Sequence, residues 1–161
     1  MEQQKEFEQT YLAYRNLAFV CANDILQNPT WAEDAVSEAF LKIMQHYDCL
    51  AEPTGMQTKR FVAVVTRNTA LNLLRHYRRL RPLSPAKPEP SDAAISEENA
   101  AVSAAIRSLP RDHRTALLLS CWCGFTAAET AKIMGKTTAL VQTLIRSGRQ
   151  KLKKRLEEEE L

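Results

Sequence analysis

Glycine and aromatic residues are scarce in this chain, which has only four Gly among 161 residues and 7% aromatic side chains. This composition argues against a fold rich in strands and tight turns. No apolar run approaches the length that crosses a bilayer, so we expect no membrane insertion. The first residues, 1–6, are polar and partly acidic and lack the basic and then apolar order of a secretory signal, which predicts a cytoplasmic location.

Cysteine is also too sparse to build a disulfide framework, and reduced thiols are the default expectation for Cys21, Cys49, Cys121 and Cys123. Cys121 and Cys123 have no second Cys or His pair at zinc-ligand spacing, so we predict neither a metal site nor a cofactor. Paired catalytic carboxylates, a nucleophile arrangement and a phosphate-binding glycine loop are likewise not evident. We therefore expect a protein that is not an enzyme and has no catalytic residues.

Basic residues are clustered, although the formal net charge is only +3. One cluster lies mid-chain at Arg75, Arg78, Arg79 and Arg81, and a second lies within residues 146–155, followed by an acidic run at 157–160. Two separate basic patches indicate two contacts with a polyanion. Solvated helix faces are the alternative interpretation, because charge runs usually have that role.

The first half of the chain shows three stretches with helical periodicity. Apolar spacing predicts a helix from about Lys5 to Leu26, which Asn28 and Pro29 interrupt. Thr30 can cap a second helix, whose apolar stripe is Val36, Ala39, Phe40, Ile43 and Tyr47. A third helix is expected from Thr58 to about Leu80, with one face formed by Phe61, Val64, Val65, Asn68 and Leu71. We assign residues 1–80 to a first domain.

Four prolines fall between Arg81 and Asp92 without apolar periodicity, which predicts a linker at residues 81–95. Helical spacing resumes from about Ser96, and Pro110 can occupy the first position of a further helix. The expected fold class is therefore all-α, with two small helical domains at 1–80 and 96–161 joined by a proline-rich linker.

The second domain contains the pattern of a helix-turn-helix. Thr126 and Glu129 form a capping box, Gly135 can close the short helix in a left-handed conformation, and Thr137 can cap the next helix. Small Ala131 allows a close crossing, against which Val141 packs. An ordinary helical hairpin is the alternative.

In a helix-turn-helix, the first turns of the second helix enter the major groove. These turns carry Thr137, Thr138, Ala139, Leu140, Gln142, Thr143 and Arg146, which can contact base edges. Lys136, Arg149, Lys151 and Lys153 favour phosphates. For Leu144, core packing and base contact both remain open.

Several segments resemble a known family over nearly the whole chain. Residues 108–114, 124–135 and 141–152 resemble region 4 of extracytoplasmic-function sigma factors, in the sigma-70 family. Residues 32–42 resemble region 2.2, and residues 61–79 resemble regions 2.3 and 2.4. The resemblance implies a region 2 three-helix bundle and a region 4 helix-turn-helix. It also implies a protein that binds RNA polymerase core and directs promoter-specific initiation.

The resemblance also implies site residues. The core polymerase-binding residues would be Asp34, Ser37, Glu38 and Lys42. Region 2 would contact and melt the minus-ten element through Arg67, Asn68, Asn72, Arg75, His76, Arg78 and Arg79, with the loop 48–58 capturing an unstacked base. Region 4 would bind the minus-thirty-five element through Lys136, Thr137, Thr138, Leu140, Gln142, Thr143, Arg146 and Arg149. RNA polymerase core and promoter DNA are the expected partners, with an anti-sigma factor as a candidate third.

The sequence departs from the family pattern in both regions. In region 2 the departures are Trp31, Ser37, Val64 and Asn72, and in the recognition helix they are Lys136, Leu140, Gln142 and Leu144. Two other functions therefore stay open beside initiation. One is a conventional DNA-binding regulator, and the other is a protein-interaction module that has lost promoter recognition.

Overall fold

The chain folds into two compact units, which divide between Glu89 and Pro90. The computed structural model describes residues 2–47, 52–80, 102 and 104–159, so the predicted linker lies outside the described residues. Every element assigned within these residues is a helix, which confirms the all-α prediction. None of the helices described there combines the length and the apolar character that a membrane span requires.

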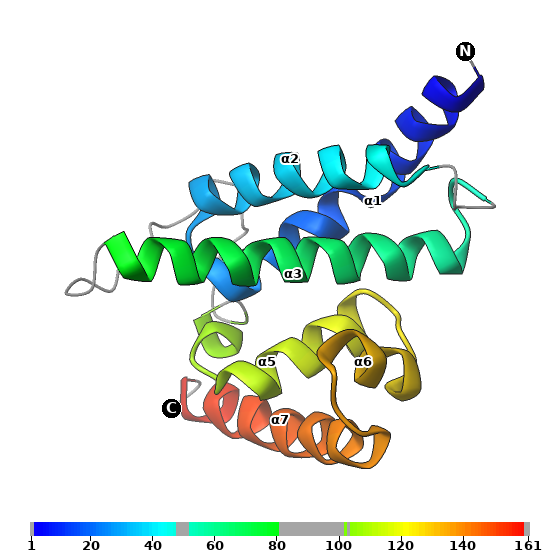
Figure 1. Ribbon diagram of the computed structural model, residues 1–161. Coiled ribbons are helices and arrows are strands. Elements are labelled where there is room, and N and C mark those ends of the chain that lie inside the picture. The colour runs from blue at the N-terminus through cyan, green and yellow to red at the C-terminus, as the bar shows by residue number, and fades with distance from the viewer. Residues whose placement is uncertain (1, 48–51, 81–101, 103, 160–161) are drawn as a thin grey trace. The chain divides into compact units, whose positions relative to one another are not determined.

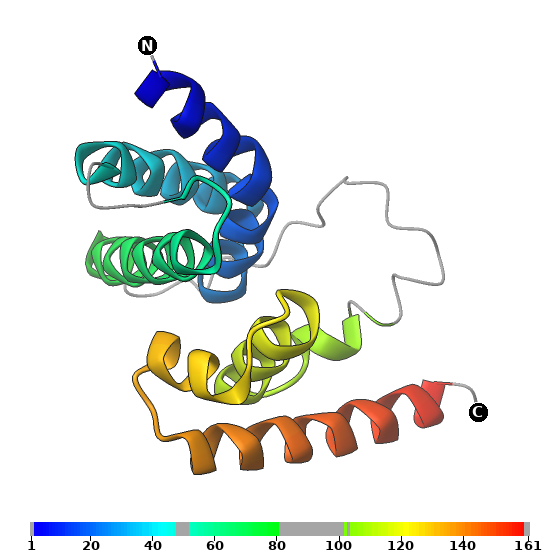
Figure 2. The same cartoon turned by 90° about the vertical axis from the view of Figure 1, so that its right-hand side faces the viewer.

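The first unit consists of α1 (Glu2–Leu26), α2 (Pro29–Gln45) and α3 (Met56–Leu80). Each helix packs against the other two, with α2 and α3 side by side and α1 crossing them (Figures 1 and 2). The apolar stripe predicted for the second helix is buried at all five positions, Val36, Ala39, Phe40, Ile43 and Tyr47, although α2 itself ends at Gln45 and Tyr47 follows it.

The turn between α1 and α2 corrects one prediction. Asn28, not Thr30, caps α2, because its side-chain Oδ1 accepts a hydrogen bond from the Trp31 backbone N–H at 3.2 Å. Gln27 just before it has a positive φ of 51°. Its side-chain amide donates to the carbonyl oxygens of Asn23 and Asp24 at 3.2 and 2.9 Å, which satisfies the end of α1.

The buried face of α3 is not the face that the sequence singled out. Phe61, Val65 and Leu71 are only half-buried and Asn68 is exposed, whereas the buried side chains are Thr58, Val62, Ala63, Thr66, Thr69 and Ala70. These residues are small, so α3 can pack closely on two helices at once. The helix also begins at Met56, two residues before the expected start.

Two hydroxyl groups of α1 hold the described end of the loop before α3. The Thr10 Oγ1 lies 2.7 Å from the Pro53 carbonyl oxygen and 3.2 Å from the Tyr47 hydroxyl, in a fully buried position. The Tyr14 hydroxyl donates to the Thr54 carbonyl oxygen at 2.5 Å, and burial raises its pKa above the usual value. The loop therefore returns to α1 at a defined position.

The second unit is built around a long final helix, α7 (Thr138–Glu159). The helices α5 (Arg111–Leu117) and α6 (Ala127–Met134) both pack against it (Figure 2). Pro110 caps α5 instead of occupying its first helical position, because its ψ of 147° is extended. Residues Leu118–Trp122 continue α5 as a π-helix, in which the Cys123 N–H donates to the Leu118 carbonyl oxygen at 2.9 Å.

Candidate functional surfaces

The helix-turn-helix has the local geometry that the sequence predicted. Thr126 Oγ1 accepts from the Glu129 N–H at 3.1 Å, and Glu129 Oε1 accepts from the Thr126 N–H at 3.2 Å, which completes the capping box. Gly135 has a φ of 68°, and the Lys136 N–H donates back to the Ala131 carbonyl oxygen at 2.9 Å. The Schellman-type turn therefore directs the chain into α7.

The start of α7 also agrees with the prediction, since Thr137 Oγ1 accepts from the Leu140 N–H at 3.2 Å. Ala131 and Val141 are buried where α6 crosses α7. Leu144 is only 8% exposed and belongs to the core, whereas Leu140 is 44% exposed. The two alternatives left open for Leu144 are thus decided in favour of packing.

Seven of the side chains predicted to contact DNA from the second unit are exposed, from the residue before α7 to its fourth turn. They are Thr137, Thr138, Leu140, Gln142, Thr143, Arg146 and Arg149. Lys136 differs, because it is half-buried and its Nζ lies 3.5 Å from the Asp112 carboxylate. Arg149 donates to the Cys121 sulfur at 3.4 Å, which ties it to the π-helix. Sequence reasoning had no signal for either contact.

His113 connects α5 to α7. Its Nε2 lies 3.2 Å from the Ser147 hydroxyl, and its Nδ1 is buried without a hydrogen-bond partner among the described residues. Burial lowers the pKa of the imidazole from its usual 6.5, and the positive charge of Lys151 lowers it further, while Asp112 opposes them. The surroundings of His113 therefore favour the neutral ring over the charged one.

In the first unit, the outer face of α2 combines acidic and apolar side chains. Asp34, Ser37 and Glu38 are exposed, as required of a binding surface. Leu41 and Met44 continue the same face at 58% and 51% exposure, and the sequence analysis missed them. Their spacing of seven and ten residues from Asp34 was the available signal.

Lys42 lies one turn after Glu38, at the edge of this face that is next to α3. Its Nζ lies 3.6 Å from the Glu38 carboxylate and donates to Thr69 Oγ1 at 3.3 Å, so the side chain is turned toward α3. The Glu38 pair is about half exposed and contributes at most about 1 kcal/mol to stability.

The residues predicted to contact DNA from α3 form an exposed row along its length. Asn68, Asn72, Arg75 and Arg79 follow spacings of four, three and four residues, which places them on one face. His76 and Arg78 are exposed beside this row, while Arg67 is half-buried. The end of α3 is therefore a strongly basic surface.

A pocket of about 440 Å³ opens at one end of this row. Its lining comes from α2, the residue that follows α2, and α3, and comprises Lys42, His46, Phe61, Val65, Asn68 and Thr69. Phe61 and Val65 offer an apolar wall, Asn68 offers an amide that both donates and accepts, and Lys42 adds a cation. Such a lining suits a flat, polar-edged group with a neighbouring negative charge. Asn68 was predicted, whereas His46, Phe61 and Val65 were missed as pocket residues.

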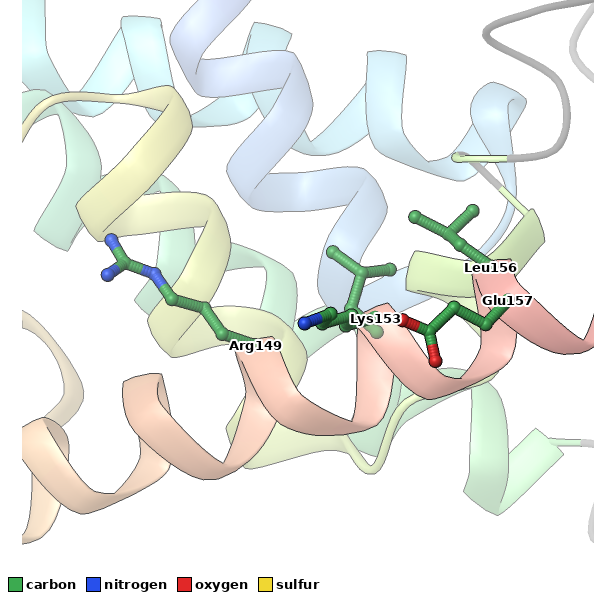
Figure 3. A pocket seen from close by; sticks show the side chains of 5 residues that line it. Arg149, Lys153, Leu156 and Glu157 are labelled. Atoms are coloured by element: carbon green, nitrogen blue, oxygen red, sulfur yellow. The ribbon is translucent and has the colours of Figure 1, made fainter.

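A second, smaller pocket of about 270 Å³ lies along the later turns of α7. It is lined by Arg149, Leu152, Lys153, Leu156 and Glu157, and Figure 3 shows these side chains along α7, with four of them labelled. This pocket therefore begins after Arg146, the last of the candidate base contacts. Within the described part of the chain, no group of three or more His, Cys, Asp or Glu side chains is placed to hold a metal ion.

Comparison with known proteins relates both units to one family. The model for Sigma-70 region 2 matches residues 10–80, and the model for Sigma-70, region 4 matches residues 99–152. A curated relative, the probable RNA polymerase sigma factor RfaY of Xanthomonas campestris pv. campestris, is 30% identical over 153 residues. That alignment covers 86% of this chain and 37% of the relative, so the chain spans well under half of the relative's length.

Solved structures share the fold. The sigma factor RpoE of Bartonella quintana, in complex with the anti-sigma factor NepR, aligns with a TM-score of 0.76 at 19% identity, covering 95% of this chain and 98% of that one. CnrH, in complex with the cytosolic domain of CnrY, aligns with a TM-score of 0.66 at 20% identity, covering 96% and 90%.

Proposed function

This chain belongs to the sigma-70 family, with the two-region organisation of its extracytoplasmic-function type, and we propose that it binds RNA polymerase core and directs promoter-specific transcription initiation. The observation that carries the proposal is that one chain holds two different kinds of surface. An acidic and apolar face on α2 suits a protein partner, and exposed recognition residues on α7 suit duplex DNA. A cytoplasmic location follows, and no catalysed reaction is part of the proposal.

We assign core binding to the α2 face, through Asp34, Ser37 and Glu38, with Leu41 and Met44 as apolar anchors. Exposed apolar side chains beside carboxylates are the mixture found where charges set the orientation and apolar groups supply affinity. The double variant Asp34→Ala, Glu38→Ala should weaken binding to purified core by roughly tenfold or more.

A matched control removes the same charge elsewhere in the first unit. Glu6 and Glu8 are exposed on α1, so the double variant Glu6→Ala, Glu8→Ala should bind core as the wild type does. Equal losses from both pairs would point to net charge and not to the α2 face.

We assign recognition of the minus-thirty-five element to the first turns of α7. Arg146→Ala should weaken binding to a duplex with this element by roughly 5- to 150-fold if the guanidinium reads a base. Lys154→Ala removes the same charge two turns later on an exposed side chain and should have a much smaller effect. Equal effects of the two variants on specific and nonspecific duplexes would contradict base readout.

We assign capture of an unstacked minus-ten base to the pocket formed by Phe61, Val65 and Asn68. The aromatic wall can stack on a base, the Asn68 amide can pair with a base edge, and Lys42 can attract the adjoining phosphate. The loop predicted for this role, 48–58, lies partly outside the described residues and remains a candidate second contributor.

The pocket is tested with fork-junction DNA that carries 2-aminopurine at the minus-ten element. Holoenzyme should raise its fluorescence as the base unstacks, and Phe61→Leu should reduce that signal while leaving core binding intact. Wild-type unstacking by both Phe61→Leu and Asn68→Ala would refute the pocket assignment.

An anti-sigma factor is the third partner that we propose, because the structural neighbour RpoE was solved with one. Such a partner should compete with core for this chain. A bound protein that leaves the affinity for core unchanged would not fit the proposal.

A further inference from the structure

The basic end of α3 lacks the buried side chains that hold the rest of that helix. Its buried side chains end at Ala70, and every side chain from Leu71 to Leu80 is half-buried or exposed. This same stretch carries the exposed side chains Arg75, His76, Arg78 and Arg79, of which three are arginines. After Leu74, Tyr77 is the one side chain of α3 that is not exposed, and helix ends with so few buried contacts open at low free-energy cost. The end of α3 therefore needs a contact from another helix if its basic side chains are to be held in an ordered arrangement.

Trp31 and Tyr77 provide that contact. Their rings stack with centroids 4.1 Å apart and an angle of 20° between planes. Tyr77 lies seven residues after Ala70 and so continues its buried stripe. Trp31 lies in the first turn of α2, where the Asn28 cap fixes its backbone. Both side chains are half-buried, and the His76 ring flanks Tyr77 at 5.9 Å.

We propose that the Trp31–Tyr77 stack is a positioning device that keeps the last turns of α3 helical and so presents Arg75, Arg78 and Arg79 to promoter DNA. The inference rests on the function proposed above. Neither ring needs to touch DNA, because both act through the arginines. An end that is ordered only part of the time binds more weakly in proportion to its ordered fraction.

The stack also connects two proposed contacts. Trp31 precedes Asp34 by three residues on α2, about one helical turn from the face assigned to core. Tyr77 stands among the cations assigned to DNA. The ring pair therefore fixes the distance between the core-binding face and the basic end of α3, within the first unit.

The test uses holoenzyme reconstituted from the full chain and core, bound to fork-junction DNA with a minus-ten element. Aromatic pairs contribute a factor of roughly 2 to 12 beyond the burial of their area, so Tyr77→Leu should weaken DNA binding by about that factor. Tyr77→Phe retains the stacked ring and should restore affinity to within about twofold of wild type. Core binding at wild-type affinity shows that each variant is folded.

Two further readouts separate positioning from general damage. Trp31→Leu should match Tyr77→Leu, and the double variant should lose no more than either one, because both remove the same stack. Amide hydrogen exchange should lose protection at residues 75–80 in these variants and keep it at Val62 to Ala70.

Wild-type affinity and exchange in both leucine variants would overturn the positioning role while leaving the proposed function standing. Additive losses from the two variants would also overturn it. If wild-type holoenzyme itself fails to bind the fork, the proposed function fails first, and the positioning role fails with it.

Discussion

Replacing Gly135 tests the turn that sets the direction of the recognition helix. Gly135 has a φ of 68°, in the left-handed region that other L-residues rarely adopt. A Cβ added there would meet no atom within 4 Å, so backbone strain is the main cost of Gly135→Ala. That strain costs about 1–2 kcal/mol. Alanine also lowers the entropy of the unfolded chain, which offsets about 0.4–1 kcal/mol of this cost.

The net expectation is that Gly135→Ala lowers the free energy of unfolding of the second unit by about 1 kcal/mol. Gly135→Asn is the control, because asparagine tolerates this conformation better, and it should lose roughly half as much. Trp31 and Trp122 lie in different units, so urea unfolding followed by fluorescence in a Trp31→Phe background reports on the second unit.

An unchanged slope with a shifted midpoint would assign the effect to stability of the folded unit. The reasoning is refuted if Gly135→Ala is stabilising, because the turn would then not require the left-handed conformation. It is also refuted if Gly135→Asn is more damaging than Gly135→Ala.

Three further changes probe the second unit by the same assay. Thr126→Ala removes the acceptor of the capping box and should cost about 0.5–2 kcal/mol, whereas Thr126→Ser should be nearly neutral. Gly148→Ala should fail to give the gain of about 1 kcal/mol expected inside a helix, because its Cβ would lie 3.0 Å from Leu117 Cδ1; a full gain would show that Leu117 moves freely. Because folding lowers the pKa of His113, the unfolded chain takes up a proton at this residue at a higher pH than the folded chain does. Stability is therefore complete above the unfolded pKa of 6.5 and falls as the pH drops below it, and a His113→Asn variant that kept this pH dependence would contradict the assignment.

Local signals in the sequence were sufficient for the helix-turn-helix. The capping box, the Gly135 turn and the Thr137 cap each depend on residues within five positions of one another, so the chain encodes them without tertiary context. The stripe of α2 was predictable for a similar reason, since its large apolar residues face a single side.

Other features depend on contacts that sequence spacing does not contain. Asn28, and not Thr30, caps α2 because the helix already begins at Pro29, one residue before Thr30. The buried face of α3 carries small residues such as Ala63, Thr66 and Ala70, which have little weight in an apolar pattern. The larger Phe61 and Val65 are half-buried and line a pocket instead.

The partners of charged side chains were equally inaccessible. Lys136 meets Asp112 and Arg149 meets Cys121 across separations of 24 and 28 residues in the chain. Neither pair has a local signature. Most of the predicted site residues are exposed, while Lys42, Arg67 and Lys136 are half-buried, and the contacts of the last of these could not be named from the sequence.

Transcription by purified bacterial core polymerase on fragmented genomic DNA, with and without this protein, tests the central claim most directly. The account predicts discrete start sites that appear only when the protein is added and that Arg146→Ala diminishes. Measurable core binding without any protein-dependent start site would contradict it and would favour a protein-interaction module that has lost promoter recognition.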